Sequence, residues 1–259
     1  MYNGLRIGTT GMKSSQKVMD NVSDQIANVN TTGYKKREVV FKDLLRNEVG
    51  KNHVMVSENA GNISIGAGSR GEIVKTNFTQ GAITPSEGSF HMALEGGGFF
   101  GVRVEGNELV YTRNGAFQMN GDGSITDEEG NALEMEQTLP LAQWGQMTGI
   151  SISDEGLVKG RDANGVSQNL GQVMVFVPEN NDDMLSLGEG RYTSNKGALR
   201  ANVNGGEGFP KIKQNFLENG NVTLVESMTE MMITQRAYQA NAKSISTADQ
   251  MLEVINTII

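Results

Sequence analysis

The chain has 259 residues, and 22 Lys and Arg against 30 Asp and Glu give it a net charge of −8 at pH 7. This balance argues against general binding of nucleic acid or of anionic lipid, because both partners require a basic protein surface. The absence of cysteine excludes disulfides, thiolate metal sites and cysteine nucleophiles. No segment approaches 18 consecutive apolar residues, and the N-terminal segment has no apolar core of a cleavable secretory signal.

The N-terminal segment, residues 1–33, is predicted to be a helix with a narrow apolar stripe. Leu5, Met12, Met19 and Ile26 recur at a spacing of seven residues. Small or polar side chains take half of the interleaved positions, which are Gly8, Ser15, Val22 and Val29. The helix is expected to end at Gly33, because glycine readily adopts the left-handed conformation that follows a helix.

A longer helix is predicted at the other end of the chain, over residues 217–259. The same spacing of seven residues relates Leu224, Met231, Tyr238, Ile245 and Leu252, with Met228, Gln235 and Ala242 between them. Asn221 is expected to cap this helix, and Thr223 with Glu226 matches the pattern of a capping box. Neither Pro nor Gly interrupts the sequence after residue 220.

The middle of the chain alternates short apolar runs with turns rich in Gly and Asn. This pattern predicts an antiparallel β-rich domain over residues 91–216, preceded by an extended or hairpin connecting region over residues 34–90. Asn114-Gly115 stands between two alternating runs and predicts a hairpin turn. The stretches 47–72 and 179–216 are expected to be loop-like or extended. The predicted fold class is α+β, with a helix at each end and β structure between them.

The lengths of the two helices indicate assembly. At 1.5 Å per residue they would extend over about 42 Å and about 57 Å, beyond the ~30 Å span of a small domain. They are therefore expected to pair with each other as a coiled-coil domain, and the remaining apolar surface should contact other chains. The predicted subunit-interface positions are Leu5, Met12, Met19, Ile26, Leu224, Met231, Tyr238, Ile245 and Leu252.

No catalytic, cofactor or metal site is predicted, and no small-molecule substrate. Residues 66–71 match G-x-G-x-x-G, but a strand-like sequence follows where a dinucleotide site requires a helix. His53 and His91 stand in unrelated contexts and form no ligand set. Two alternatives to a structural subunit remain. The first is a secreted β-rich adhesin or carbohydrate-binding protein, which would use Trp144 and the Gly/Asn loops. The second is an enzyme that uses the acidic loops, although the sequence offers no nucleophile–base pair for it.

Two segments resemble the flagellar axial proteins, which comprise rod, hook and hook-associated proteins. The first is "MDNVSDQIANVNTTGYKKREVVFKDLL", with family positions Ala27, Asn28, Thr31, Gly33, Tyr34 and Phe41. The second is "NVTLVESMTEMMITQRAYQANAKSISTADQMLEVI", with family positions Gln235, Arg236 and Asn241. "GGGFFGV" and "YTRNGAFQMNGDG" resemble the middle of the same proteins. The chain departs from the family at Asp24, where an asparagine is usual.

The resemblance implies a structural subunit of the flagellar basal-body rod, with the terminal helices as an inner layer of a hollow helical tube. With 259 residues the chain is closer in length to the rod proteins than to the longer hook protein. Of the rod proteins it resembles the distal one slightly more than the proximal one. The implied partners are further copies of the chain, other rod and hook proteins, the type III export apparatus and, in a Gram-negative cell, the P-ring and L-ring. The implied location is the basal body in the cell envelope and periplasm, reached without a cleaved signal peptide.

Overall fold

The computed structural model describes residues 2–44, 47–48, 64–65, 68–104, 106–140, 144, 147–162, 166–195, 197, 199–202 and 208–258. The chain forms two compact units. Unit 1 comprises Met1–Ala27, Arg37–Lys75 and Thr223–Ile259, and unit 2 comprises Asn28–Lys36 and Thr76–Val222. Most of the stretch 47–72, which was expected to be loop-like or extended, lies outside the described residues.

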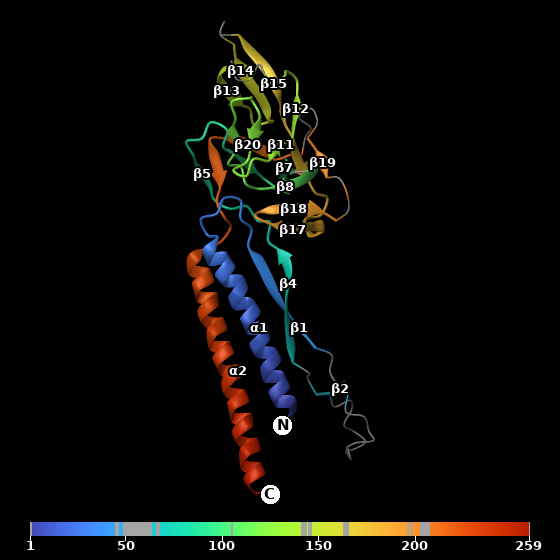
Figure 1. Ribbon diagram of the computed structural model, residues 1–259, viewed down its shortest axis with the longest axis vertical. Helices are drawn as coiled ribbons and strands as arrows, with labels where there is room; N and C mark the ends of the chain where they lie inside the picture. Colours follow the sequence, from blue (N-terminus) through green and yellow to red (C-terminus); the bar gives the residue numbers. More distant parts are fainter. Residues whose placement is uncertain are drawn as a thin grey trace. The chain divides into compact units, whose positions relative to one another are not determined.

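Unit 1 is built on two long helices that lie side by side, α1 (Tyr2–Ala27) and α2 (Leu224–Ile258) (Figure 1). A ribbon of β1 (Arg37–Asp43) and β4 (Ser69–Thr76) accompanies them, and β1 contacts α1. The short strands β2 (Asn47–Glu48) and β3 (Ser64–Ile65) pair in antiparallel fashion. No helix in the described part of the chain is both long and apolar enough to span a bilayer.

The N-terminal helix ends earlier than predicted, at Ala27 instead of Gly33. Asn28 and Thr31 close a turn directly after it, because the Thr31 N–H donates to the Asn28 carbonyl oxygen at 3.1 Å and the Thr31 hydroxyl donates to the Asn28 side chain at 3.1 Å. Local side-chain bonds of this kind compete with helix formation. Gly33 does have a positive φ of 68°, but in the segment that belongs to unit 2.

The C-terminal helix begins at Leu224, so the predicted boundary at residue 217 and the predicted cap at Asn221 are wrong. Residues Phe216–Glu218 form strand β21. The Asn221 side chain instead accepts the Lys36 backbone N–H at 2.7 Å and donates to the Asn77 carbonyl at 2.8 Å. The Asn221 side-chain amide therefore makes hydrogen bonds within unit 2 and does not cap α2.

Unit 2 is β-rich, and every strand pairing recorded within it is antiparallel, as predicted. The largest sheet has the order β17-β18-β8-β7-β11-β10-β9, and β16 joins β7 and β19. A second sheet has the order β12-β15-β14-β13, and the pairs β20-β6 and β21-β5 complete the unit. The strands are β5 (Ile83–Pro85), β6 (Met92–Glu95), β7 (Phe99–Val104), β8 (Glu108–Thr112), β9 (Gln118–Met119), β10 (Ile125–Thr126), β11 (Ala132–Leu133), β12 (Met135–Gln137), β13 (Thr148–Ile152), β14 (Leu157–Arg161), β15 (Ser167–Val173), β16 (Val175–Val177), β17 (Met184–Gly188), β18 (Arg191–Ser194), β19 (Arg200–Ala201), β20 (Lys211–Gln214) and β21.

The predicted hairpin at Asn114-Gly115 is wrong, because β8 pairs with β7 and β18 and not with β9. Asn114 does turn the chain: its N–H donates to the Thr112 hydroxyl at 3.0 Å and its side chain accepts from the Ala116 N–H at 3.1 Å. Gly115 then lies against strand β6, where a Cβ atom would overlap the carbonyl oxygen of Met92. The glycine marks a close approach of two backbones, and its sequence neighbours alone do not distinguish this from a hairpin turn.

The stretch 179–216, expected to be loop-like or extended, is extended in most of its described part, which contains a 3-10 turn (Asn181–Asp183) and strands β17 to β21. The strands are short and their glycines occupy turns, as at Gly190 with a φ of 70°. Such short runs give too few alternations for the period of a strand to stand out.

The main core of unit 2 lies between its sheets and contains Trp144, which is fully buried. The Trp144 ring N–H donates to the carbonyl oxygen of Leu139 at 3.2 Å. This placement agrees with a core role and removes the side chain on which a carbohydrate-binding platform depended. A second cluster packs Phe99, Tyr111 and Phe176 with Phe78 and Tyr192.

Candidate functional site

The face of α1 that packs against α2 follows the seven-residue pattern of the sequence. Gly8, Ser15 and Val22 are buried along it. Between them the predicted interface residues are half-buried, namely Leu5, Met12, Met19 and Ile26. Successive positions are therefore three and four residues apart, which is the spacing of a coiled-coil seam.

On the matching face of α2 most of the predicted stripe is half-buried, but Ser227 and Thr234 are buried between its members, one residue before the predicted Met228 and Gln235. Ser227, Thr234 and Ala248 are buried, whereas Met228 is 49% exposed and Gln235 is also exposed. The half-buried positions between them are Met231, Tyr238, Asn241, Ile245 and Leu252. The remaining predicted interface residue, Leu224, is 40% exposed at the start of the helix. One set of seam positions is thus mostly small or polar in both helices: Gly8 and Ser15 in α1, and Ser227, Thr234 and Ala248 in α2.

Two glycines of α1 set how closely the helices approach. A Cβ atom at Gly8 would lie 2.7 Å from Cγ1 of Ile245, and one at Gly11 would lie 2.8 Å from Nδ2 of Asn241. Real Cβ atoms do not approach that closely, so a Cβ atom at either position would require the facing side chain to shift. Small residues of this kind let two helix backbones pack tightly, and the pairing specifies which residues face each other.

The opposite face of α1 is polar and binds the β1–β4 ribbon of unit 1. Asn21 and Gln25 donate their side-chain amides to the Arg37 carbonyl oxygen at 2.7 and 2.9 Å. The Arg37 guanidinium in turn pairs with Asp24 at 2.6 Å. Asp24, the position that departs from the family pattern, therefore supplies the carboxylate for an ion pair with the neighbouring strand.

The family-motif residues do not form one site. Ala27 ends α1, and Asn28, Thr31, Gly33 and Tyr34 belong to the turn segment of unit 2. Phe41 is 55% exposed on β1. On α2, Gln235 and Arg236 are exposed, while Asn241 packs on Gly11. Some motif residues thus contribute to helix packing, others form the turn after α1, and others are exposed on the surface.

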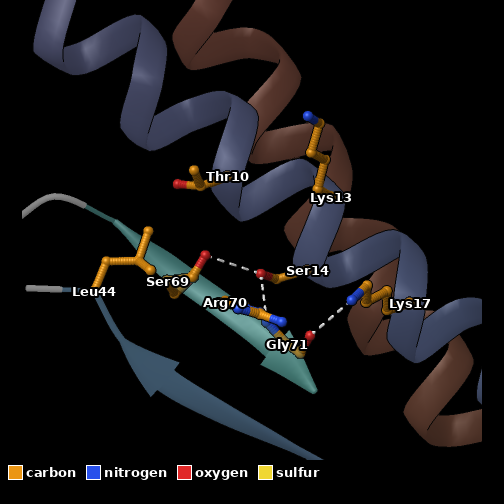
Figure 2. A pocket seen from close by; sticks show the side chains of 8 residues that line it. All are labelled: Thr10, Lys13, Ser14, Lys17, Leu44, Ser69, Arg70 and Gly71. Atoms are coloured by element: carbon orange, nitrogen blue, oxygen red, sulfur yellow. Dashed lines mark hydrogen bonds between the residues drawn. The ribbon is translucent and has the colours of Figure 1, made fainter. Parts of the chain in front are cut away.

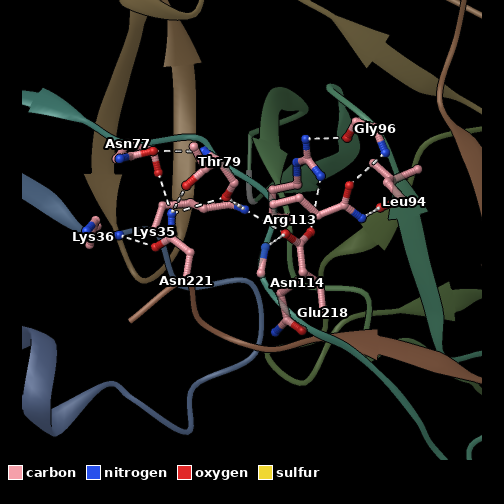
Figure 3. A network of polar contacts seen from close by, with 12 residues as sticks. Lys35, Lys36, Asn77, Thr79, Leu94, Gly96, Arg113, Asn114, Glu218 and Asn221 are labelled. Atoms are coloured by element: carbon pink, nitrogen blue, oxygen red, sulfur yellow. Dashed lines mark hydrogen bonds and ion pairs between the residues drawn. The ribbon is translucent and has the colours of Figure 1, made fainter. Parts of the chain in front are cut away.

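The turn segment contributes a buried ionic cluster to unit 2 (Figure 3). Lys35 donates to Oε1 of Glu218 at 2.6 Å, and Arg113 donates to Oε2 of the same carboxylate at 3.1 Å. The three side chains are no more than 2% exposed. Burial lowers the pKa values of both Lys35 and Arg113, and their contacts with Glu218 oppose that effect. One carboxylate therefore compensates two cations inside the protein.

Backbone groups complete the coordination of this cluster. Lys35 also donates to the Thr79 carbonyl oxygen at 2.8 Å, and Arg113 donates to the Gly96 carbonyl oxygen at 2.8 Å. Glu218 accepts the Gly81 N–H at 2.8 Å, and its own carbonyl oxygen accepts the Gly33 N–H at 2.8 Å. Within the described residues only Nε of Arg113 lacks a partner in the cluster. Charges so deeply buried are costly unless paired, so the cluster fixes which segments meet here.

Sequence reasoning missed this cluster, because 183 residues separate Lys35 from Glu218 and 105 separate Arg113 from Glu218. The acidic turn at Asp127 and Glu129 contacts Arg191, a second pairing between residues far apart in the sequence. Among the described residues no group of His, Asp or Glu side chains is arranged to hold a metal ion.

Comparison with known proteins agrees with this architecture. Three family profiles match the chain: "Flagella basal body rod protein" over residues 5–35, "Flagellar hook protein FlgE/F/G D1 domain" over residues 93–160, and "Flagellar basal body rod FlgEFG protein C-terminal" over residues 213–258. Their order follows α1, the β-rich region and α2.

Relatives that match the chain over nearly its whole length show which family it belongs to. The chain is 32% identical to the flagellar basal-body rod protein FlgG of Buchnera aphidicola subsp. Acyrthosiphon pisum over 100% of both proteins. It is 33% identical to FlgG of Bacillus subtilis over 99% of both and 31% identical to FlgG of Caulobacter vibrioides over 98% of both. The chain belongs to the flagellar basal-body rod protein family, and it is a structural subunit of the rod and not an enzyme.

Proposed function

We propose that the chain is the distal-rod subunit and that it assembles with further copies of itself into a hollow helical tube. Copies would pack α1 and α2 as a coiled-coil layer around the channel and place the β-rich unit outside that layer. Full-length similarity to rod proteins named FlgG favours this position over a proximal-rod or hook-type subunit.

The observation that carries the proposal is the apolar surface that α2 leaves exposed. In its first half Val225 is 74% exposed, Met232 54% and Ile233 64%. In its second half Met251 is 50% exposed, Val254 57% and Ile258 79%. Scattered apolar residues are normal on a surface, but an extended set on one helix indicates a protein–protein contact. Neighbouring copies would cover it.

The predicted seam residues take a different part in this proposal. Met231, Tyr238, Ile245 and Leu252 are half-buried and lie on the α2 face that packs against α1, so only part of each is available to another copy. The flanking exposed residues would supply most of the new buried area. Assembly and helix pairing thus depend on different side chains of the same helix.

The partners follow from the proposed location in the basal body within the cell envelope. The subunit would meet other rod and hook proteins at the two ends of its segment and, in a Gram-negative cell, the P-ring and L-ring around it. It would reach this location through the flagellar type III export apparatus without cleavage of a signal peptide. Nothing in this scheme requires a cofactor, a nucleic acid or a small-molecule substrate.

Replacing the exposed apolar residues tests the proposal. Met232→Asp with Ile233→Asp should leave the far-UV circular dichroism of the purified monomer unchanged, because both side chains already face solvent. The same variant should produce no rods and no swimming in a strain that lacks the chromosomal copy. Gln239→Asp, an exposed polar position of the same helix, is the matched control and should support normal rods. Normal rods with the double variant would refute the proposed use of this surface.

A further inference from the structure

A pocket of about 210 Å³ lies in unit 1 between α1 and the start of β4 (Figure 2). Lys13 and Lys17 of α1 and Arg70 of β4 line it, together with Leu44 at the end of β1. No carboxylate belongs to the lining in the part of the chain that the structure describes. The pocket therefore combines three cations with one apolar side chain, Leu44.

Internal contacts use some of these polar groups but not all. The Ser14 hydroxyl bonds to the Ser69 carbonyl oxygen at 3.1 Å and to the Gly71 N–H at 2.9 Å, and Lys17 donates to the Gly71 carbonyl oxygen at 3.2 Å. These bonds hold α1 and β4 together and shape the pocket. Lys13 and Arg70 are exposed and donate no hydrogen bond to the described residues. The Glu72 carboxylate, which pairs with Lys42 at 3.1 Å, also attracts Arg70 at longer range. Both cations thus keep their hydrogen-bond donors available to an anionic partner.

The C-terminal half of α2 has the complementary chemistry. Asp249 and Glu253 are four residues apart, so their carboxylates lie on one side of the helix, and both are exposed. Neither is in an ion pair within the described chain. Met251 and Val254, exposed beside them, could cover Leu44, the apolar side chain of the lining. The helix as a whole carries four carboxylates against Arg236 and Lys243.

The α2 helix of the same molecule cannot place these carboxylates in the pocket. Gly8 lies opposite Ile245 and Gly11 opposite Asn241, so the helices run antiparallel. Continuing this register brings the pocket residue Ser14 level with Tyr238, which is 11 residues before Asp249 and 15 before Glu253. That separation corresponds to roughly 20 Å along the helix axis. The carboxylates must come from a copy that is displaced along this axis.

We propose that the pocket receives Asp249 and Glu253 of a second copy of this chain, with Lys13 and Arg70 as their partners. The inference rests on the proposed assembly and identifies one contact within it. The contact joins two different surfaces, so each copy offers a pocket to one neighbour and an acidic helix segment to another. Such heterologous contacts generate open-ended assemblies, as a rod requires.

Charge reversal on each side gives the test. The pocket variant carries Lys13→Glu and Arg70→Glu, and the helix variant carries Asp249→Lys and Glu253→Lys. Each full-length protein is purified, checked by circular dichroism, and followed by sedimentation and negative-stain microscopy. Each variant alone places like charges in the contact, so the critical concentration for assembly should rise about tenfold or more. The equimolar mixture should assemble close to wild type, because alternating copies restore opposite charges at every contact.

A matched control changes the net charge equally at a distance from the pocket. Lys159→Glu with Lys211→Glu reverses two exposed lysines of unit 2 and should assemble as wild type does. If a reversed variant fails to fold, the neutral pair Lys13→Gln and Arg70→Gln should still raise the critical concentration.

The outcomes separate this contact from the proposed function. Unchanged assembly of the two reversed variants would refute the pocket contact while wild-type assembly upholds the rod proposal. Loss of assembly that mixing does not restore would also refute the contact, because pairing would not be its cause. Failure of the wild-type protein to assemble would count against the rod proposal itself.

Discussion

Glu218 accepts a hydrogen bond from Lys35 at 2.6 Å across 183 residues of sequence, and the two side chains are essentially inaccessible to solvent. Lys35 belongs to the turn segment after α1, and Glu218 ends β21 shortly before α2. The pair therefore joins, within unit 2, the two segments through which the chain enters from one helix and leaves toward the other. Arg113, from the end of β8, binds the same carboxylate.

Glu218→Gln should be among the most destabilising single changes in unit 2. The amide removes the negative charge and leaves Lys35 and Arg113 as two buried cations with no anion between them. Breaking a buried ion pair from one side costs about 3–5 kcal/mol. Urea unfolding followed by tryptophan fluorescence measures the loss, since Trp144 lies in the core of this unit.

The control for this change is an ion pair on the surface. Lys213 and Glu95 pair at 3.0 Å with side chains 40% and 51% exposed. Glu95→Gln should change the unfolding free energy by less than about 1 kcal/mol, because water screens the pair. Equal effects of the two substitutions would contradict the structural weight given to the buried cluster.

Gly8→Ala should weaken the pairing of α1 with α2 although alanine favours helix. The new methyl group would meet Cγ1 of Ile245 at 2.7 Å, which forces the helices apart. Gly4→Ala is the matched change, because nothing lies within 4 Å of its Cβ position, and it should stabilise α1 by up to about 1 kcal/mol. Amide hydrogen exchange along α1 distinguishes the two.

Relief of the clash provides the internal check. Ile245→Ala removes the atoms that collide with the new methyl group, so it should cost less in the Gly8→Ala background than in the wild-type protein. Purely additive effects in this double-mutant cycle would show that the two residues do not contact each other.

Ile245→Asp should act within the subunit as well as on assembly. Ile245 packs on Gly8, so an aspartate would place a charge in the seam between α1 and α2. We expect lower helix content in the monomer by circular dichroism and a loss of rods. The exposed double substitution Met232→Asp and Ile233→Asp should instead abolish rods with no change in helix content. Monomers of Ile245→Asp with full helix content would reject the assignment of Ile245 to the seam.

Gly115→Ala should destabilise unit 2 severely, because a Cβ atom there would overlap the Met92 carbonyl oxygen. The expected cost is about 3 kcal/mol or more, in the range of changes that disrupt a core. Gly121→Ala, in the turn between β9 and β10 with open space around its Cβ position, should be close to neutral. Thermal unfolding of both variants measures the difference, and a mild effect of Gly115→Ala would mean that β6 moves aside at low cost.

Local pattern was sufficient for the two helices and the α+β class. The repeat of Leu5, Met12, Met19 and Ile26 predicts α1 because burial along a helix follows the helical period. These features depend on residues close together in the chain, whose types alone carry the signal.

The features that the sequence did not predict correctly depend on which other part of the protein each residue packs against. The pattern of α2 placed Met228 and Gln235 in the seam, but the structure buries Ser227 and Thr234 there, one residue earlier in each case. Asn114-Gly115 has the residues of a hairpin turn, and only the position of Met92 makes Gly115 a contact between backbones. Lys35, Arg113 and Glu218 are charged residues of types that usually lie on the surface. Only the folded structure brings them together and excludes water from them. Residues close in sequence determine the periodicity of a helix or strand and the position of a turn. Which distant residues pair is decided by the tertiary structure, because only there must each buried charge find a partner and each close backbone contact be free of side-chain overlap.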